Sequence, residues 1–387
     1  MTETEIKEHL TLGGKLTAEV LEPMKDAFVG KDEIIDLLGV CLVAGENLFI
    51  LGPPGTAKSA LVQDLARRLD GRVFDYLLTR FTEPNELFGP FDIRKLREGE
   101  LVTNTEGMLP EASLIFLDEL LNANSAILNS LLMVLNERVF RRGRETRALP
   151  TLMVVGASNR LPDDDALGAL FDRFLLRVPC DNVQPEELPD VLVAGWKLDL
   201  ERNGRLATVT TEDVRRLQDL LRAVDLSVVR GPYVELVRRL RHAGIPVSDR
   251  RAVKLQRLMA ASALLCGRLQ VNTTDLWVLR YIWDTEEQQD VLKSIVQDAV
   301  TKSSRSDQEA SHPRARGVDA PDPEHLARDL DRLGERLGGE VAATERSYLQ
   351  DQLGLLAARC QWVEDGQRRQ FLEKKVDGLW QRLGGRK

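Results

Sequence analysis

A short glycine- and proline-rich segment holds the clearest candidates for chemistry. It has the sequence GPPGTAKS, covers residues 52–59, and joins an apolar run to a segment with helical spacing. A loop that binds phosphate needs backbone N–H groups turned inward, a lysine that reaches the β and γ oxygens, and a hydroxyl group for Mg²⁺ at the start of a helix. Lys58 and Ser59 supply the last two groups. The sequence therefore predicts a nucleotide-phosphate loop, with a tight structural turn as the alternative.

Ala57 stands where the common pattern of such loops has glycine. Glycine adopts positive backbone φ values readily, whereas a residue with a Cβ atom does not. We therefore expect φ at Ala57 to lie below zero.

Two later apolar segments also end in polar side chains. Residues 114–119, with the sequence LIFLDE, end in Asp118 and Glu119 about two βα units after the loop. Such acids fit a Mg²⁺-holding carboxylate and a water-activating carboxylate, and the alternative is an acidic helix N-cap. Residues 152–159 end in Asn159, whose amide could orient water or contact the γ-phosphate, although Asn is also common at strand ends.

The elements around these residues alternate between strand and helix. Apolar runs with strand character occur before the loop and within residues 72–79, 112–119 and 151–159, with helical or polar segments between them. This alternation predicts an α/β fold with a largely parallel sheet. After Pro185 the apolar spacing becomes helical, with Thr211 and Thr273 as expected N-caps.

The same patterns predict four regions. We expect an α/β domain over residues 1–195, an all-helical domain over 196–302, a polar linker or mobile loop over 303–323, and a C-terminal helical segment over 324–387. In the last segment Leu326, Leu330, Leu333 and Leu337 recur in steps of four and three, which fits a helical bundle or a short coiled-coil seam.

Composition fits a globular protein of several domains. The chain has 387 residues, of which 43% are hydrophobic, 29% charged and 5% aromatic, and its net charge is −8. The four cysteines lack metal-binding spacing, so we expect small buried residues in a reducing cytoplasm. We expect no zinc site, because the histidines have no paired spacing. A basic-then-apolar leader and an apolar run of membrane-spanning length are both missing from the sequence, so neither secretion nor a membrane span is expected.

The motifs, in this order and spacing, resemble those of the AAA+ ATPases and, within them, the MoxR group. GPPGTAKS resembles its Walker A motif, LIFLDE its Walker B motif, ASN its sensor 1, and ALFDRF its arginine-finger segment. The segments LTRFTEPNELFGPFDI and GMLPEASLIFLDELLNANSAILNSLLMVLNERVFRRG look like the RavA branch, which also has Ala before the Walker lysine. The resemblance is most specific over residues 10–195, weaker over 196–300 and weakest beyond. It implies an AAA+ nucleotide-binding domain with a parallel sheet, followed by an all-helical lid.

The resemblance also implies a role for each matching position. Asp118 would support Mg²⁺ together with Ser59, Glu119 would polarise the attacking water, and Asn159 would be sensor 1. Arg173 would be the finger that reaches the active site of a neighbouring subunit. The residues implied in nucleotide binding are Val29, Gly30, Gly52, Pro53, Pro54, Gly55, Thr56, Ala57, Lys58, Ser59 and Ala60.

Two of these assignments have alternatives. The stretch SDRRA resembles the family's sensor 2 segment, and its extra arginine leaves the register open between Arg250, which we favour, and Arg251. Val29 and Gly30 resemble the segment that lines the adenine pocket, and the alternative is the ordinary start of a helix.

The resemblance implies Mg²⁺-dependent ATP hydrolysis by a ring, with a homo-hexamer expected because a finger supplied in trans requires closed subunits. It further implies chaperone-like remodelling of an unidentified protein client, together with a von Willebrand factor A domain protein. A nucleic-acid-directed motor and a nucleotide-gated scaffold with little turnover are the alternatives. Between Val214 and Arg257 there are eleven Lys or Arg residues against four acids, but Tyr233 is the only aromatic residue, so nucleic-acid binding is not expected.

Overall fold

The computed structural model describes two separate units of the chain. The first comprises residues 1–312 and the second residues 313–387. The described residues are 3–99, 101–142, 145–200, 207–301, 311–316, 323–337, 346, 349–350, 353–354, 356–357, 360, 363 and 366–383. Most of the expected linker over residues 303–323 therefore lies outside the described residues.

The first unit is built around a five-stranded parallel sheet with the strand order β2-β3-β6-β1-β7. Its strands are β1 (Leu48–Leu51), β2 (Val73–Leu77), β3 (Leu114–Asp118), β6 (Met153–Ser158) and β7 (Leu176–Pro179). The central strands β1 and β6 are buried along their whole length, which explains why both are continuous apolar runs in the sequence. The expected α/β fold is confirmed.

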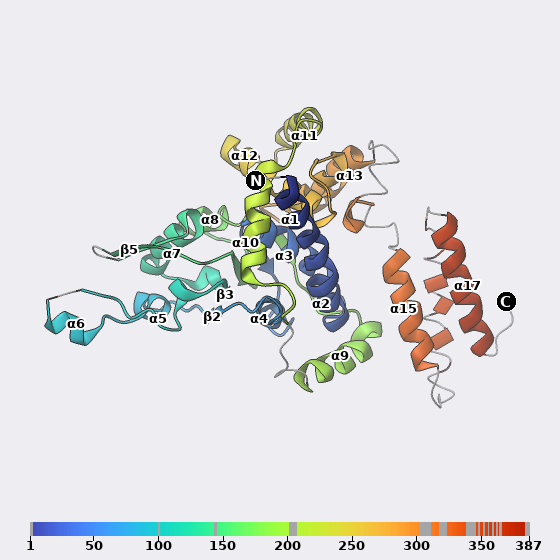
Figure 1. Ribbon diagram of the computed structural model, residues 1–387, viewed down its shortest axis with the longest axis horizontal. Helices are drawn as coiled ribbons and strands as arrows, with labels where there is room; N and C mark the ends of the chain where they lie inside the picture. The colour runs from blue at the N-terminus through green and yellow to red at the C-terminus, as the bar shows by residue number, and fades with distance from the viewer. Residues whose placement is uncertain are drawn as a thin grey trace. The chain divides into compact units, whose positions relative to one another are not determined.

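Helices surround this sheet (Figure 1). Helix α3 packs against β1 and β7, and α4 packs against β2 and β3. The helices are α1 (Glu3–Leu16), the π-helical turn η1 (Thr17–Leu21), α2 (Glu22–Ala27), α3 (Asp32–Ala44), α4 (Lys58–Arg68), α5 (Pro84–Phe88), α6 (Ile93–Arg97), α7 (Ser125–Glu137), α8 (Asp165–Phe171) and α9 (Leu188–Leu200). Short 3-10 turns are η2 (Leu109–Glu111), η3 (Leu120–Asn122) and η4 (Pro185–Glu187), and a two-stranded hairpin is formed by β4 (Val139–Arg142) and β5 (Glu145–Ala148).

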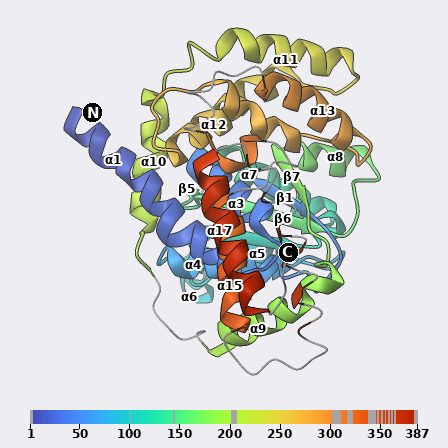
Figure 2. The ribbon, with the colours of Figure 1, turned by 90° about the vertical axis from the view of Figure 1, so that its right-hand side faces the viewer.

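The helical lid follows and packs on the same core. It consists of α10 (Thr211–Leu220), η5 (Leu221–Ala223), α11 (Arg230–His242), α12 (Asp249–Leu265), η6 (Thr273–Tyr281) and α13 (Gln288–Val300), and α11, α12 and α13 are labelled in Figure 2. Helix α12 packs against α3, where Arg257 Nε donates to the carbonyl oxygen of Ala44 at 3.0 Å. The expected boundary between residues 195 and 196 falls inside α9.

Two helix starts differ by one residue from the sequence expectation. The N-cap of α10 is Thr210 rather than Thr211, and the N-cap of η6 is Asn272 rather than Thr273. In both, a capping box decides the register, because the acid three residues after the cap, Asp213 or Asp275, accepts a hydrogen bond from the N–H group of the cap residue.

The second unit contains α15 (Pro323–Arg336) and α17 (Gly366–Arg382), which pack against each other. The leucines that recur in steps of four and three on α15, Leu326, Leu330 and Leu333, are buried, as are Leu372 and Val376 of α17. Among the helices that the structure describes, none combines the length and the apolar character that a membrane span requires.

Candidate functional site

Three adjacent strands bring the predicted loop, acids and amide to one edge of the sheet. In the register, Leu51 of β1 pairs with Ser158 of β6, and Gly156 of β6 pairs with Leu117 of β3. The loop of residues 52–59, Asn159, and the Asp118–Glu119 pair therefore all follow the carboxyl ends of neighbouring parallel strands. In open α/β sheets this edge is where ligands bind.

The first residue of the loop, Gly52, packs closely against the backbone of two neighbouring segments. Gly52 donates its N–H to Ser158 at 2.9 Å, and a Cβ atom at Gly52 would lie 2.1 Å from the carbonyl oxygen of Cys180. Only glycine fits there, because backbone atoms cannot move away as a flexible side chain can. Lys58 is 5% exposed, and its Nζ donates to the carbonyl oxygens of Gly52 and Pro53 at 2.8 and 2.7 Å. The ammonium group is therefore held against the loop itself.

The backbone at Ala57 contradicts the expectation of a negative φ. Ala57 has φ 66° and ψ 20° and directly precedes α4, and Gly55 has φ 84°. The expectation considered only the local cost of the methyl group, whereas the loop needs left-handed residues to reverse direction within a few residues. Thr56 supports the turn, because its Oγ1 donates to the carbonyl oxygen of Pro53 at 3.0 Å. Pro53, Pro54, Gly55 and Ala57 of the loop are exposed, as is Ala60 of α4, and Ser59 is half-buried.

The two acids differ in their surroundings. Asp118 ends β3, and its Oδ1 accepts a hydrogen bond from the N–H group of Glu119 at 3.0 Å. Glu119 has a left-handed backbone, with φ 51°, and its Oε2 accepts from Asn122 Nδ2 at 3.4 Å. On the neighbouring strand, burial and the negative charge of Asp118 raise the pKa of Asp75.

Asp118 and Ser59 offer oxygen donors that suit Mg²⁺. A carboxylate and a hydroxyl group are hard ligands, and Mg²⁺ is commonly held by one or two carboxylates together with substrate phosphates. Both residues are half-buried. The donor set fits the ion.

Asn159 and the segment Val29–Gly30 lie at the same edge of the sheet. Asn159 is exposed directly after β6. Gly30 has φ 71°, and a Cβ atom there would lie 3.0 Å from Val183 Cγ1, in the segment that follows β7. Next to it, Lys31 Nζ donates to the carbonyl oxygen of Asp181. The segment Val29–Gly30 therefore lies beside the residues that follow β7. One of these residues, Cys180, contacts the loop.

Arg173 lies at the opposite edge of the sheet. It lies three residues before the start of β7, and its carbonyl oxygen accepts from Asn47 Nδ2 at 3.1 Å, while Asn47 directly precedes β1. The four residues of β1 separate Asn47 from the loop by about 13 Å, at roughly 3.3 Å per residue. Arg173 Nη1 donates to Asp172 at 3.1 Å, and its Nε has no hydrogen-bond partner among the residues that the structure describes. The structure therefore does not bring Arg173 to the loop of its own chain.

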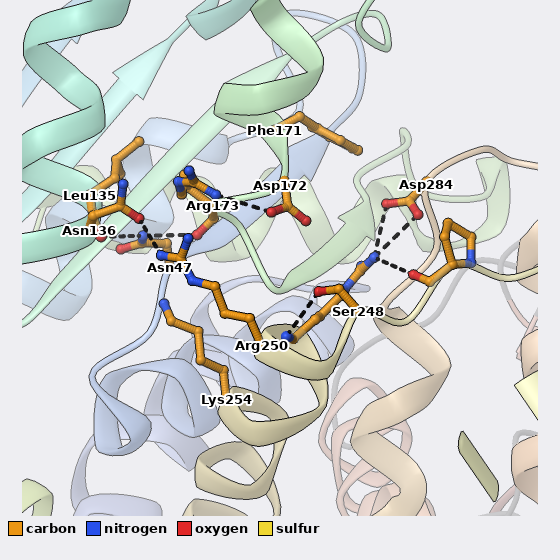
Figure 3. A network of polar contacts seen from close by, with 12 residues as sticks. Asn47, Leu135, Asn136, Phe171, Asp172, Arg173, Ser248, Arg250, Lys254 and Asp284 are labelled. Atoms are coloured by element: carbon orange, nitrogen blue, oxygen red, sulfur yellow. Dashed lines mark hydrogen bonds and ion pairs between the residues drawn. The ribbon is translucent and has the colours of Figure 1, made fainter. Parts of the chain in front are cut away.

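Arg250 lies at that same far edge. Its Nη2 donates to Asn136 Oδ1 at 3.1 Å, in the last turn of α7, and Figure 3 shows both residues in the same polar network as Asn47 and Arg173. Arg250 is exposed, as a group that meets an external ligand must be.

Arg251 has a different environment. It is 5% exposed, donates to the carbonyl oxygen of Ile282 at 2.5 Å, and pairs with Asp284 at 3.2 Å. The fully buried Arg177 of β7 pairs with the same carboxylate at 2.8 Å. Arg251 therefore belongs to the packed joint between β7 and the lid.

Sequence reasoning did not identify Arg177, Asn47 or Arg138 as important. A single polar or charged residue at the start of an apolar strand was the available signal for Asn47 and Arg177. Arg138, which donates to Asn47 Oδ1 at 2.6 Å, follows an amphipathic helix like many solvated arginines, so nothing in the local pattern distinguishes it.

Comparisons with known proteins identify the same two modules. Residues 14–219 match the family model described as the MoxR domain in the MoxR-vWA-beta-propeller ternary systems, and residues 233–296 match the AAA lid domain. An uncharacterized protein of Methanocaldococcus jannaschii is 35% identical over 286 residues, which cover 73% of this chain and 74% of that protein. The chaperone MoxR1 of Mycobacterium tuberculosis is 25% identical over 201 residues, which cover 51% of this chain and 52% of MoxR1.

A solved structure supports the fold. The crystal structure of a protein from Cytophaga hutchinsonii, proposed to be an ATPase, aligns with a TM-score of 0.62 and 20% identity, and covers 77% of this chain and 97% of that chain. The narrower RavA-like assignment stays a prediction.

Proposed function

Because the chain belongs to the MoxR family of AAA+ ATPases, we propose that it hydrolyses ATP with Mg²⁺ in a hexameric ring whose active sites are shared between neighbouring subunits. Lys58 and the loop N–H groups bind the phosphates, and Val29 and Gly30 contact the adenine. Ser59 and Asp118 hold Mg²⁺, which when bound neutralises charge on the β and γ phosphates. Glu119 orients and polarises the attacking water, and Asn159 contacts the γ-phosphate.

The observation that carries the shared site is the placement of candidate groups at opposite edges of one sheet. The loop and the two acids follow the carboxyl ends of the strands, whereas Arg173 precedes β7 at the amino ends. A guanidinium group that neutralises charge on the transferring phosphoryl group has to touch it, and such groups contribute several kcal/mol to catalysis. The length of β1 keeps Arg173 away from its own loop, so Arg173 serves the site of the next subunit.

Arg250 supports the same arrangement. Its hydrogen bond to Asn136 puts it at the Arg173 edge, and we propose that it also acts on the neighbour's nucleotide. Arg251 is committed to Asp284 and to backbone carbonyl groups of the lid, which favours Arg250 as sensor 2.

We further propose that the ring remodels or matures a protein client with a von Willebrand factor A domain partner. The description of the matching family model names such systems, and one relative is described as a chaperone. The client is unidentified. The four free cysteines suit a reducing compartment such as the cytoplasm.

Mixing two inactive variants tests the shared site. Arg173→Ala keeps the loop and loses the finger, whereas Glu119→Gln keeps the finger and loses the group that polarises water. Each variant alone is expected to turn over ATP slowly. In an equal, randomly mixed ring, about a quarter of the interfaces combine an intact loop with an intact finger, so turnover should recover to about a quarter of the parent value.

The control is Arg238→Ala, which removes an arginine that is 70% exposed and makes one ion pair with Glu235 at 4.0 Å. This variant should turn over ATP like the parent. Absence of recovery in the Arg173→Ala and Glu119→Gln mixture, when both variants form rings, would show that the site is not shared. A ring that binds ATP but turns it over no faster than Glu119→Gln would instead be a nucleotide-gated scaffold.

A further inference from the structure

A buried amide lies directly beneath the finger. Asn47 is 1% exposed and precedes the apolar strand β1, where a polar side chain is costly unless it is hydrogen-bonded. Its Nδ2 donates to the carbonyl oxygens of Arg173 at 3.1 Å and Leu135 at 3.4 Å, and its Oδ1 accepts from Arg138 Nη2 at 2.6 Å. Figure 3 shows Asn47 between Leu135 and Arg173. Both N–H groups and the oxygen of this amide are thus engaged.

Arg138 fixes which way the amide faces. It ends α7 with a left-handed backbone, φ 54° and ψ 41°, which is uncommon for a residue with a side chain and costs of order 1 kcal/mol or more. Burial lowers the pKa of its guanidinium to about 10, while the negative charge of Glu46 opposes this shift. Because a guanidinium can only donate, it must face the amide oxygen, which turns the amide N–H groups toward Arg173.

The backbone of Arg173 is fixed by this amide, whereas its guanidinium group makes few contacts. The carbonyl group of Arg173 is held by Asn47, whereas its guanidinium contacts only Asp172 among the described residues, and its Nε has no partner there. The same last turn of α7 also holds Arg250 through Asn136. The last turn of α7 therefore contacts Arg250 directly and Arg173 through Asn47.

We infer that Asn47, oriented by Arg138, is a positioning residue that sets Arg173 for catalysis in the neighbouring subunit. This inference rests on the proposed function, because it requires Arg173 to act in trans. Asn47 touches no substrate. It acts by fixing the Arg173 backbone, and a displacement of about 1 Å in a catalytic group can cost on the order of a hundredfold in rate.

The test is Asn47→Asp, which keeps the shape of the side chain and an oxygen for Arg138. It removes the two N–H donors and puts an oxygen against the carbonyl oxygen of Arg173. We expect kcat to fall about ten- to a hundredfold while KM for ATP stays within about twofold, since the finger acts in the transition state rather than in ATP binding. Asn104→Asp, the same change on an exposed turn, should leave both constants unchanged.

Mixing again separates a trans role from a purely structural one. A mixture of Asn47→Asp with Glu119→Gln should recover as much turnover as a mixture of Arg173→Ala with Glu119→Gln, because the Asn47→Asp subunit still supplies an intact loop. A mixture of Asn47→Asp with Arg173→Ala should recover nothing, because every interface then has a defective finger edge.

Three outcomes of these experiments would contradict the inference or the proposed function beneath it. If Arg173→Ala is complemented by Glu119→Gln and Asn47→Asp is not, Asn47 matters for its own subunit and the positioning role is wrong, while the shared site stands. If Arg173→Ala itself is not complemented, the proposed function fails first. Parent-like turnover of Asn47→Asp also overturns the inference.

A second pair of variants covers the case in which Asn47→Asp does not fold. Arg138→Met keeps the apolar stem and loses the donor, and Arg138→Lys restores one donor. We expect Arg138→Met to show the same kcat loss and the same complementation, with Arg138→Lys recovering part of the rate. Equal rates for the two Arg138 variants would contradict the orienting role.

Discussion

Replacement of Ala57 by glycine should stabilise the nucleotide-free protein, although alanine normally favours folding over glycine. Ala57 has φ 66°, which is the left-handed region, and its side chain is exposed. The methyl group therefore buries little surface, and its main effect is on the backbone. Removing it relieves that backbone strain.

The magnitude follows from two opposing terms. A residue with a Cβ atom pays roughly 1–2 kcal/mol in the left-handed conformation. Glycine instead makes the unfolded chain more flexible, which costs about 0.4–1 kcal/mol. The difference predicts that Ala57→Gly raises the free energy of unfolding by about 0.5–1 kcal/mol.

Gly55 provides the mirror-image control within the same loop. It has φ 84°, and a Cβ atom built there meets no atom within 4 Å, so Gly55→Ala introduces backbone strain without a steric clash. Gly55→Ala should therefore lower the free energy of unfolding by about 0.5–1 kcal/mol. The double variant should lie near the parent.

Urea unfolding without nucleotide measures these differences as shifts of the midpoint at constant slope. A lower stability of Ala57→Gly than of the parent, or a midpoint shift in the same direction for both single variants, would show that backbone strain at these positions does not set the stability of the loop. Titration with ATP should accompany the unfolding series, since a loop that still binds phosphate shows that the glycine has not disordered it.

Three other results are expected. Asp284→Ala should lower the free energy of unfolding by about 3–5 kcal/mol in urea, because the buried cations Arg177 and Arg251 both lose the carboxylate that they share; a change within about 0.5 kcal/mol would contradict this. Arg250→Ala should reduce ATP turnover with little change in the urea midpoint, whereas Arg251→Ala should destabilise the lid; the reverse pattern would make Arg251 the sensor 2 residue. Desolvation and the negative charge of Asp275 raise the pKa of the Cys266 thiol to about 12, so iodoacetamide should label Cys266 slowly at pH 8 until urea is added; rapid labelling of the native protein would contradict the raised pKa.

The sheet and the loop were predictable because their signals are local. A short apolar run indicates a buried strand, and β1, β3 and β6 are all such runs. The glycine- and proline-rich loop marks the carboxyl end of β1, and polar residues mark the carboxyl ends of β3 and β6. The register of β1 with β6 and of β6 with β3 then brings Asp118 and Asn159 to the loop without further information.

The far edge was not predictable in the same way. Leu135 and Arg173 lie 88 and 126 residues after Asn47 in the sequence, so no local pattern relates the three residues. Ala57 shows a different limit: its propensity argues for a negative φ, but the loop as a whole imposes the opposite sign. The geometry of the turn therefore overrides the φ preference of alanine, as often happens at a functional site.

Backbone strain offers an independent argument that both edges of the sheet are functional. Among the residues that the structure describes, four that are not glycine have positive φ: Ala57, Asp70, Glu119 and Arg138. Ala57 and Glu119 lie at the loop edge, Arg138 lies at the edge that holds Arg173, and Asp70 lies in the turn that follows α4. Each costs of order 1 kcal/mol or more, and such residues persist where surrounding contacts determine the backbone and where function needs a side chain aimed in one direction. The coincidence of strain with Glu119 and Arg138 is what a site assembled from two edges of two subunits would require, because each edge must be rigid before the subunits meet.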